Sequence, residues 1–172
     1  MGKITFILGG ARSGKSSYAA KLAGRKPKKV AFIATSTASD KEMKRRIAIH
    51  QKERPVSWKT FEEALNITPL IKNIGNRFNI IIIDCLTLLV SNMMFNGFSQ
   101  TRIEKEIGLM LETLAGIRAE SIIVSNEVGL GIIPKNKVAR AFRDIAGRVN
   151  QIAAKKSNNL CFMVSGIPWR IK

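Results

Sequence analysis

The sequence predicts an α/β fold with a mostly parallel central sheet flanked by helices, built as a single domain over residues 1–172. Three observations lead to this prediction. Short apolar runs alternate with segments of helical periodicity along the whole chain. The apolar runs are nearly continuous, which is typical of strands that are covered on both faces. A length of 172 residues suffices for one full core and is short for two ordinary domains.

The apolar runs and the periodic segments define the expected elements. Strands are expected at 3–8, 29–35, 78–84, 120–126 and 159–166. Helices are expected at 16–24, from near Ser39 toward Pro55, from near Thr101 onward, and at 137–156. Ser39 and Thr101 are each followed three residues later by a Glu, which is the spacing of a capping box. Because ligands of such folds bind beyond the carboxyl ends of the strands, we look for chemistry there.

Composition narrows the classes of function. The chain holds 29 Lys and Arg against 12 Asp and Glu, a net charge of +17, which favours a polyanion or a phosphorylated ligand. Apolar runs fall short of the ~18 residues of a membrane span, and the N-terminus is a poor signal peptide. Cys85 and Cys161 lie in strand-like segments and are expected to be buried free thiols. These features predict a cytoplasmic protein.

The strongest motif is "GGARSGKSS", which follows the first expected strand and opens the first expected helix. Gly9, Gly14, Lys15 and Ser16 match the phosphate-binding loop (P-loop) pattern G-x-x-x-x-G-K-[ST]. Glycines let backbone N–H groups turn inward around phosphates, and the helix adds its positive N-terminus. Lys15 is expected to reach the β- and γ-phosphates, and the Ser16 hydroxyl to bind Mg²⁺.

A P-loop also needs an acid near its magnesium ion, at the end of another strand. The run "IIIID" supplies Asp84 directly after four isoleucines. By itself, Asp84 could also be a residue that ends a strand or caps a helix, which is the weaker of the two interpretations. Beside a P-loop, we expect it to hold Mg²⁺ directly or through a water molecule.

Two other strand ends carry polar residues. Thr35 and Ser36 follow the second expected strand, and Asn126 and Glu127 end the fourth. The first pair could line a nucleotide site, and the second could contact a substrate or orient a hydroxyl group. Both are also good turn sequences. The pattern does not decide between these interpretations.

The chain has one histidine, His50, in the basic stretch "RRIAIHQKERP". On a regular helix, Arg46, His50 and Arg54 would share one stripe. Neighbouring cations disfavour the imidazolium form and would keep the imidazole neutral and nucleophilic. Cations would also stabilise charge during attack on phosphorus. From spacing alone, a solvated, charged helix remains the better interpretation.

Taken together, these stretches resemble the bifunctional adenosylcobinamide kinase/adenosylcobinamide-phosphate guanylyltransferase family of cobalamin biosynthesis, over essentially the whole chain. The resemblance rests on the P-loop, "IATS", "RIAIHQKERP", "DCLTLLVSNMM", "SNEVGLGIIP", "FRDIAGRVNQ" and "VSGIPWRIK". The segment ending H-x-x-x-R-P, together with "NEVGLGIIP" and "FRDIAGRVNQ", is far more specific than the P-loop.

This resemblance implies a RecA-like P-loop domain that assembles as a homotrimer, and two reactions. A phosphoryl group passes from ATP or GTP to adenosylcobinamide. His50 then takes GMP from GTP and passes it to the cobinamide phosphate, giving adenosylcobinamide-GDP. Lys15 acts with His50 in catalysis, and Ser16 and Asp84 hold Mg²⁺. The nucleotide contacts of the family map onto Gly9, Gly10, Ala11, Arg12, Ser13, Gly14, Lys15, Ser16, Ala34, Thr35, Ser36, Gln51, Lys52, Glu53, Arg54, Glu62 and Asp84.

Two other functions are compatible with parts of the pattern. The P-loop, Asp84 and the net charge would suit a RecA-type nucleic-acid-dependent ATPase, although the chain lacks interleaved aromatic and basic residues for stacking single strands. A small-molecule kinase with an idle His50 is the second alternative. The apolar stretch "VSNMMFNGF" and Trp169 could touch the corrinoid or a subunit interface, and core packing is the simpler interpretation of the stretch.

Overall fold

The computed structural model describes residues 2–24, 29–37, 45, 51 and 54–172. Its strands are β1 (Ile4–Gly9), β2 (Val30–Ala34), β3 (Lys59–Glu62), β4 (Ile80–Asp84), β5 (Glu120–Asn126), β6 (Asn159–Val164) and β7 (Ile167–Arg170). Its helices are α1 (Lys15–Ala23), α3 (Ile67–Ile74), α4 (Leu86–Phe95), α5 (Gln100–Gly116) and α6 (Lys137–Lys156).

The strands form one seven-stranded sheet in the order β3-β2-β4-β5-β1-β6-β7. All neighbouring pairs are parallel except β6 and β7, which form an antiparallel hairpin at one edge. The prediction of an α/β fold with a mostly parallel sheet is therefore confirmed. Strand β5 lies between β1, which leads into the P-loop sequence, and β4, which ends in Asp84.

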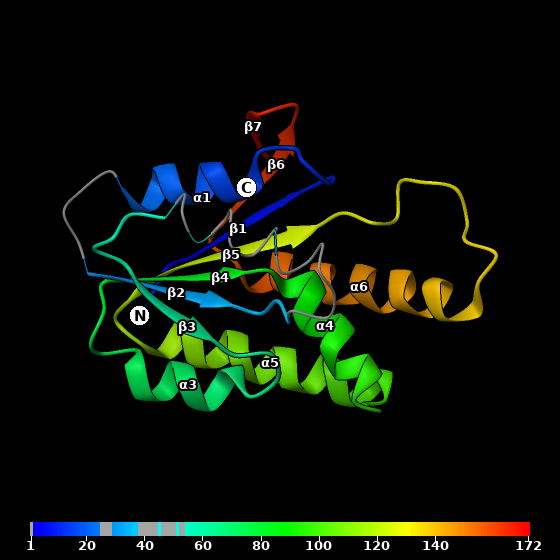
Figure 1. The fold of residues 1–172 in the computed structure, drawn as a ribbon, viewed down its shortest axis with the longest axis horizontal. Helices are drawn as coiled ribbons and strands as arrows, with labels where there is room; N and C mark the ends of the chain where they lie inside the picture. The colour runs from blue at the N-terminus through cyan, green and yellow to red at the C-terminus, as the bar shows by residue number, and fades with distance from the viewer. Residues whose placement is uncertain (1, 25–28, 38–44, 46–50, 52–53) are drawn as a thin grey trace.

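The two faces of the sheet are covered unequally (Figure 1). Helix α1 covers one face, where Ala19 and Ala23 pack on Ile7, Ile82 and Val124. The other helices cover the opposite face, where a larger apolar cluster includes Phe6, Ile33, Ile81, Ile83 and Ile123 from the strands. Alternate residues of each central strand thus enter different cores, and this explains the continuous apolar runs of the sequence.

All five expected strands are confirmed, with ends that differ by two residues or fewer. The helix expected at 16–24 begins at Lys15, and the helix at 137–156 has the expected bounds. The latter is capped by the Asn136 side chain, whose Oδ1 accepts hydrogen bonds from the N–H groups of Val138 and Ala139. The helix expected from Ser39 lies almost wholly outside the described residues; Arg45 and Gln51 are both helical.

The helix expected to start near Thr101 is confirmed, but its N-cap is not Thr101. Helix α5 begins at Gln100, and Ser99 is its N-cap, because the Ser99 hydroxyl accepts a hydrogen bond from the N–H of Arg102. The sequence pattern also did not predict β3, β7, α3 and α4. Strands β3 and β7 are short, largely exposed edge strands without an apolar run, and α4 is too uniformly apolar to show helical periodicity.

Core packing accounts for most of the apolar stretch at 90–98. Val90 and Met93 are buried on the inner face of α4, whereas Phe95 is 80% exposed. The expected burial of the two unpaired thiols, Cys85 and Cys161, is confirmed. In the part of the chain that the structure describes, there is no helix long and apolar enough to cross a membrane.

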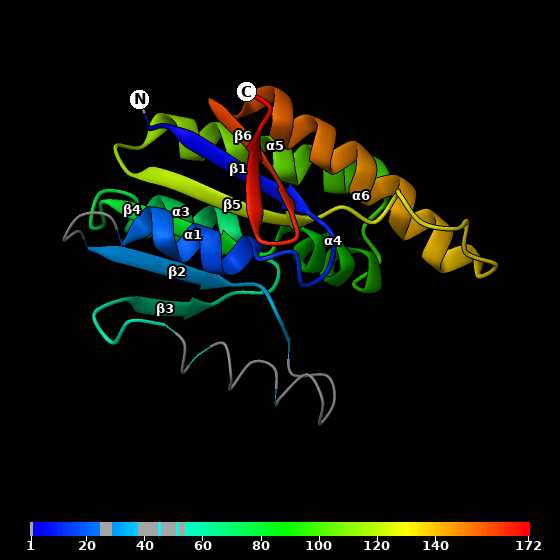
Figure 2. The same ribbon diagram turned by 90° about the horizontal axis from the view of Figure 1, so that it is seen from above.

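One part of the molecule projects from the body. The loop at 127–136 and the first half of α6 extend past the end of the sheet in both views (Figures 1 and 2). We call residues 127–142 the arm. Its side chains Leu130, Ile132, Ile133 and Val138 are between 55% and 97% exposed. An apolar surface of this kind marks a place where another surface binds.

Candidate active site

Four strands end in functional candidates at one edge of the sheet. Gly9 of β1 is paired in register with Asn126 of β5, and Ala34 of β2 is paired with Asp84 of β4. Because these strands are parallel, their carboxyl ends all lie at this edge, which we call the carboxyl edge. The sequence-predicted P-loop, Asp84, Thr35 and Asn126 are therefore brought together by the fold.

The loop between β1 and α1 has the backbone of an anion-binding turn. Gly14 is the N-cap of α1 with φ of 90°, and Arg12 has φ of 56°. A glycine adopts the Gly14 conformation without steric cost, and the first amides of α1 are left free to bind an anion. Gly9 is required for a different reason. A Cβ atom there would lie 2.7 Å from the carbonyl oxygen of Met163.

Lys15 is 7% exposed, and its ammonium group donates a hydrogen bond of 2.5 Å to the carbonyl oxygen of Gly10. Burial lowers the pKa of Lys15, while the nearby Cys85 and Asp84 raise it. The Lys15 side chain is thus folded back on its own loop. A phosphate group entering the loop would offer it a stronger, charge-assisted partner.

The turn of the β6–β7 hairpin supports the loop from behind. The N–H of Gly166 donates a 3.0 Å hydrogen bond to the carbonyl oxygen of Ser13. A Cβ atom on Gly14 would lie 3.2 Å from the Cα atom of Gly166, so the two backbones are in close contact. The Ser13 hydroxyl is buried and has no hydrogen-bond partner among the described residues. Buried polar atoms of this kind need an explanation, and a bound anion would provide one.

The ends of β2 and β4 are locked together by side chains. The Thr35 hydroxyl donates to the carbonyl oxygen of Cys85 at 2.7 Å and accepts from its N–H at 2.8 Å. The Asn92 amide of α4 donates to the carbonyl oxygens of Thr35 and Ala64 at 2.8 and 3.1 Å. Thr35 is therefore a structural residue of the carboxyl edge, and these bonds fix the chain on both sides of Asp84.

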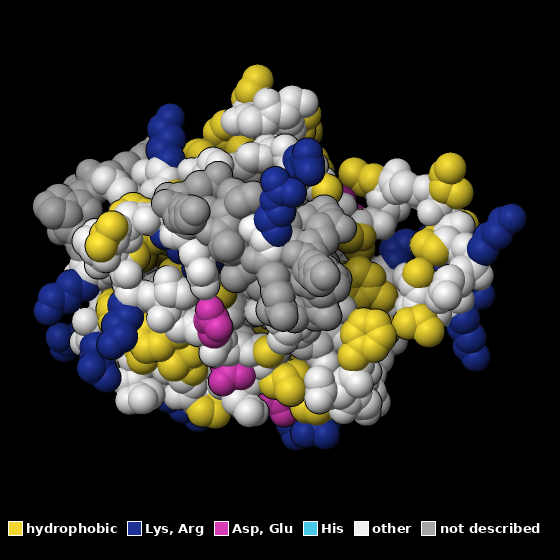
Figure 3. Space-filling model, viewed as in Figure 1, with side chains coloured by type: hydrophobic (Ala, Val, Ile, Leu, Met, Phe, Trp, Pro, Cys, Tyr) yellow, Lys and Arg dark blue, Asp and Glu magenta, His cyan; other side chains and the backbone are white. Residues whose placement is uncertain are grey.

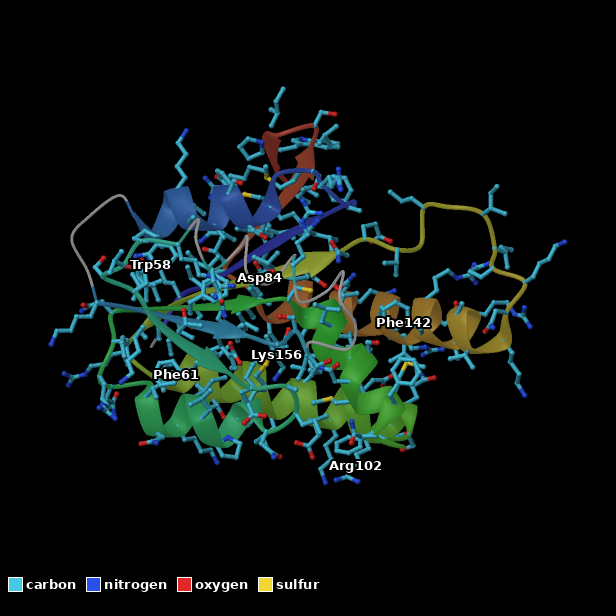
Figure 4. The ribbon with its side chains drawn as sticks, in the orientation of Figure 1. Trp58, Phe61, Asp84, Arg102, Phe142 and Lys156 are labelled. Carbon is cyan, nitrogen blue, oxygen red and sulfur yellow. The ribbon has the colours of Figure 1, made fainter. Side chains whose placement is uncertain are left out.

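A cavity of about 360 Å³ opens beside the P-loop, and Figure 4 shows two of its residues, Trp58 and Asp84, on the α1 side of the sheet. It is lined by Ser16, Ser17, Ala20, Phe32, Arg54, Trp58 and Asp84. One end of the cavity is polar, with the Ser16 hydroxyl and the Asp84 carboxylate. The other end is apolar, with the Trp58 and Phe32 rings stacked 6.5 Å apart at an angle of 21°.

Arg54 joins the two ends of this cavity. Its guanidinium carbon lies 3.7 Å from the centre of the Phe32 ring, which is a cation–π contact. Burial lowers the pKa of Arg54, and Asp84 and Glu62 raise it. Its Nη1 atom is buried without a hydrogen-bond partner among the described residues. Arg54 thus presents an unused donor beside the P-loop.

The remaining sequence-predicted residues are distributed as follows. Ala34 is buried and Ser36 is half-buried beyond β2, while Ala11 and Arg12 are exposed at the tip of the P-loop. Glu62 ends β3, and its carboxylate accepts a 3.1 Å hydrogen bond from the Gln51 side chain. His50, Lys52 and Glu53 lie outside the described residues.

Sequence reasoning missed the aromatic end of the cavity. Trp58 follows Arg54 in the stretch "RPVSWKTF", and Phe32 lies in the middle of an apolar strand. Phe32 carries no local signal, because strand apolarity explains it completely. Trp58 carries a weak signal, since a bulky aromatic residue stands beside a polar turn.

The fold and this site define a mostly parallel α/β protein whose P-loop sequence lies at the carboxyl edge of its sheet. Residues 5–171 match the family model described as cobinamide kinase / cobinamide phosphate guanyltransferase, so the chain belongs to this family. The family resemblance is confirmed, and so are the cobinamide kinase and cobinamide phosphate guanylyltransferase activities that it implied.

Curated relatives agree over nearly their full length. The chain is 39% identical to the bifunctional adenosylcobalamin biosynthesis protein CobP of Pseudomonas aeruginosa, over 96% of this chain and 95% of that protein. It is 38% identical to the bifunctional adenosylcobalamin biosynthesis proteins CobU of Escherichia coli and Salmonella typhimurium, over 98% of this chain and 99% of each relative.

The two adjacent glycines of the loop should respond differently to alanine. Gly9→Ala places its Cβ atom 2.7 Å from the Met163 carbonyl oxygen, whereas a Cβ atom on Gly10 meets nothing within 4 Å. We expect Gly9→Ala to lower the free energy of unfolding by about 1–3 kcal/mol. Gly10→Ala should change it by about 0.5 kcal/mol or less. Urea unfolding measures both, and equal losses would contradict the close approach at Gly9.

Proposed function

We propose that this chain phosphorylates adenosylcobinamide and then transfers GMP from GTP to the product, using one nucleotide site at the carboxyl edge. The observation that carries the proposal is the convergence of Lys15, Ser16, Arg54 and Asp84 on a single loop and cavity. Two cations and a helix N-terminus suit a triphosphate. Family membership supplies the acceptor.

In the first reaction, the acceptor hydroxyl oxygen forms a bond to the γ-phosphorus of ATP or GTP. The bond between that phosphorus and the bridging β,γ-oxygen breaks, the hydroxyl proton passes to solvent, and the nucleoside diphosphate leaves. Lys15 would leave the Gly10 carbonyl to contact the β- and γ-phosphates. The unused donor of Arg54 can neutralise charge on the same group.

The residues at the polar end of the cavity fit Mg²⁺. Ser16 and Asp84 both line it and offer hard oxygen donors, which this ion prefers. Clusters of three or more His, Cys, Asp or Glu are absent from the described residues. Such a site suits an ion that enters with the nucleotide and keeps phosphate and water ligands. When bound, Mg²⁺ would supply positive charge to the phosphate oxygens.

In the second reaction, the His50 imidazole attacks the α-phosphorus of GTP and releases pyrophosphate. The phosphoramidate then passes GMP to the cobinamide phosphate and regenerates His50. Gln51, the next residue in the chain, is hydrogen-bonded to Glu62, and Arg54 lines the cavity. These contacts support a nucleotide site that includes the segment carrying His50. The apolar end of the cavity, with Trp58, offers room for a nucleoside.

We further propose a single RecA-like domain over residues 1–172 that works in the cytoplasm. The order of the five strands from β3 to β1 supports this fold family, with β5 between the P-loop strand and the Asp84 strand. The rival nucleic-acid-dependent ATPase gains little support. On the face shown in Figure 3, the described Lys and Arg side chains are scattered and form no continuous groove.

We propose that the arm mediates assembly into a homotrimer. Leu130, Ile132 and Ile133 are exposed on a segment that projects from the body. Burying three such side chains against a second copy would stabilise an assembly by roughly 1.5–3 kcal/mol per side chain. A closed ring of three copies uses every arm once.

The guanylyl step is tested with GTP labelled at the α-phosphorus. We expect the wild-type protein to take up acid-labile, alkali-stable label, and His50→Ala to take up none, because the chain has no other histidine. Lys15→Ala should lose both this label and transfer of γ-label to adenosylcobinamide. Scintillation counting of precipitated protein and product chromatography measure the two reactions.

Three outcomes would count against the assignment. An unlabelled wild type would remove the guanylyl half, and equal labelling of His50→Ala would remove His50 as the carrier. Retained γ-transfer in Lys15→Ala would show that the P-loop does not hold the donor. Tight, salt-sensitive DNA binding with DNA-stimulated hydrolysis would favour the RecA-type rival.

The arm is tested by its effect on assembly. Ile132→Asn, at a side chain that is 97% exposed, should shift a trimer toward monomers at equal protein concentration. Val56→Asn changes a fully exposed valine away from the arm and should leave the mass unchanged. Size-exclusion chromatography with light scattering measures both variants. A wild-type monomer, or a trimer that Ile132→Asn leaves intact, would contradict this role for the arm.

A further inference from the structure

The carboxyl end of β5 is held in an unusual way. Strand β4 has already ended at Asp84, which is paired with Val124, so the β4-facing N–H and C=O groups of Asn126 have no strand partner. Side chains from two helices take that place. The Thr87 hydroxyl of α4 accepts from the N–H of Asn126 at 2.7 Å. The Asn150 amide of α6 donates to its carbonyl oxygen at 3.1 Å.

These contacts close into a ring through Ser125. The Ser125 hydroxyl donates to Asn150 Oδ1 at 2.7 Å, and the Thr87 and Ser125 hydroxyl oxygens lie 3.3 Å apart. Every donor direction is fixed by the backbone: the N–H of Asn126 must donate, so Thr87 accepts it and its own proton is free for Ser125. The carbonyl oxygen of Asn126 must accept, so Asn150 turns its NH₂ group toward it.

This ring is buried and fully satisfied. Thr87, Ser125 and Asn150 are 3%, 0% and 6% exposed. Asn150 is the one polar residue on the buried side of α6, whose other members are Ile145, Ala146, Val149 and Ala153. A satisfied buried network holds one geometry firmly, because each of its polar atoms would be costly to leave unpaired. Its effect is to fix the backbone of Asn126.

The side chain of Asn126 faces the reaction edge. Along β5, Ile122 and Val124 enter the core under α1, and Ser125 points to α4 and α6. Strand alternation therefore puts the Asn126 side chain on the α1 face, which also carries the P-loop and Asp84. Asn126 is paired with Gly9, and it lies one strand from Asp84 and two residues further along.

The neighbouring Glu127 has a different task. Its carboxylate Oε1 accepts a 2.7 Å hydrogen bond from the N–H of Gly129, and its own N–H donates to the Gly9 carbonyl oxygen at 3.0 Å. Glu127 thus shapes the turn where the arm begins. Of the two polar residues at the end of β5, Asn126 is the one whose side chain is left for a ligand.

We propose that Asn126 is a catalytic residue of the phosphoryl-transfer step, and that Thr87, Ser125 and Asn150 are its positioning residues. This rests on the proposed kinase function. The Asn126 NH₂ group donates a hydrogen bond to an oxygen of the γ-phosphoryl group while the bond to the β,γ-bridging oxygen breaks and the bond to the acceptor oxygen forms. A fixed donor aimed at developing charge lowers the barrier without reorganisation.

Steady-state kinetics with ATP or GTP and adenosylcobinamide test Asn126 itself. Asn126→Ala should lower kcat by about 100-fold and change the KM for nucleotide by about 3-fold or less. Label uptake from α-labelled GTP should stay within about 3-fold of wild type, because that reaction breaks the α,β bond. A matched control is Asn79→Ala, which removes an asparagine that caps the Lys29 N–H at the opposite edge and should leave kcat unchanged.

The positioning residues are tested by an isosteric pair. Thr87→Val leaves the Asn126 N–H unpaired and should lower kcat at least about 10-fold at nearly constant KM. Thr87→Ser keeps the hydroxyl and should restore kcat to within about 3-fold of wild type. If Thr87 only stabilised the fold, Thr87→Val would lower the melting temperature and the rates of both reactions together. Thr87→Ser would then restore all of these and not kcat of the kinase step alone.

The outcomes separate this inference from the function on which it rests. A wild-type protein that transfers no phosphoryl group to adenosylcobinamide would overturn the proposed function, and slow hydrolysis of ATP or GTP would then report on Asn126. Full kcat in Asn126→Ala, or equal loss of both reactions, would overturn the role of Asn126. Loss of γ-transfer in Glu127→Gln with full activity in Asn126→Ala would assign that role to Glu127.

Discussion

The constraint on which this structure depends is the satisfaction of backbone groups where parallel strands end. Neighbouring strands end at different positions along the sheet, so several backbone N–H and C=O groups at the carboxyl edge have no strand partner. Side chains replace these partners: Thr35 at Cys85, Asn92 at Thr35, and Thr87 with Asn150 at Asn126. Leaving one such buried group unpaired costs about 1–3 kcal/mol, so the edge has one preferred geometry. These hydrogen bonds therefore also fix the backbone positions from which the functional side chains extend.

Electrostatics then decide what this edge binds. Lys15 and Arg54 carry positive charge in a half-enclosed region, and burial lowers the pKa of both. Among the described residues that line the cavity, Asp84 is the one acid, and it raises the pKa of both cations. The two cations, the Arg54 donor that has no partner among the described residues and the amides at the N-terminus of α1 would together suit a polyphosphate ligand.

Some features of the fold and the site leave a local signal in the sequence, and others do not. Continuous apolar runs predicted the five inner strands, because burial on both faces leaves a local signature. Gly9, Lys15 and Ser16 were predicted as site residues because a P-loop compresses its chemistry into one short stretch, and Asp84 was predicted because an acid directly follows a buried apolar run. The Phe32–Trp58 stack and the ring at Asn126 were not predicted, because their members lie far apart in the chain and only the sheet order brings them together. Ser99 displaced Thr101 as the cap of α5 because a hydroxyl two residues earlier reaches the same free amides.

A crystal structure of the protein with GTP and Mg²⁺ would show directly where the triphosphate binds. We expect the β- and γ-phosphates to lie inside the loop from Gly9 to Ser16, and the Lys15 ammonium group to have left the Gly10 carbonyl oxygen to contact them. Asp84 should then lie on the metal side of the phosphates. Triphosphate bound elsewhere, with the bond between Lys15 and Gly10 intact, would contradict the claim that the carboxyl edge is the nucleotide site.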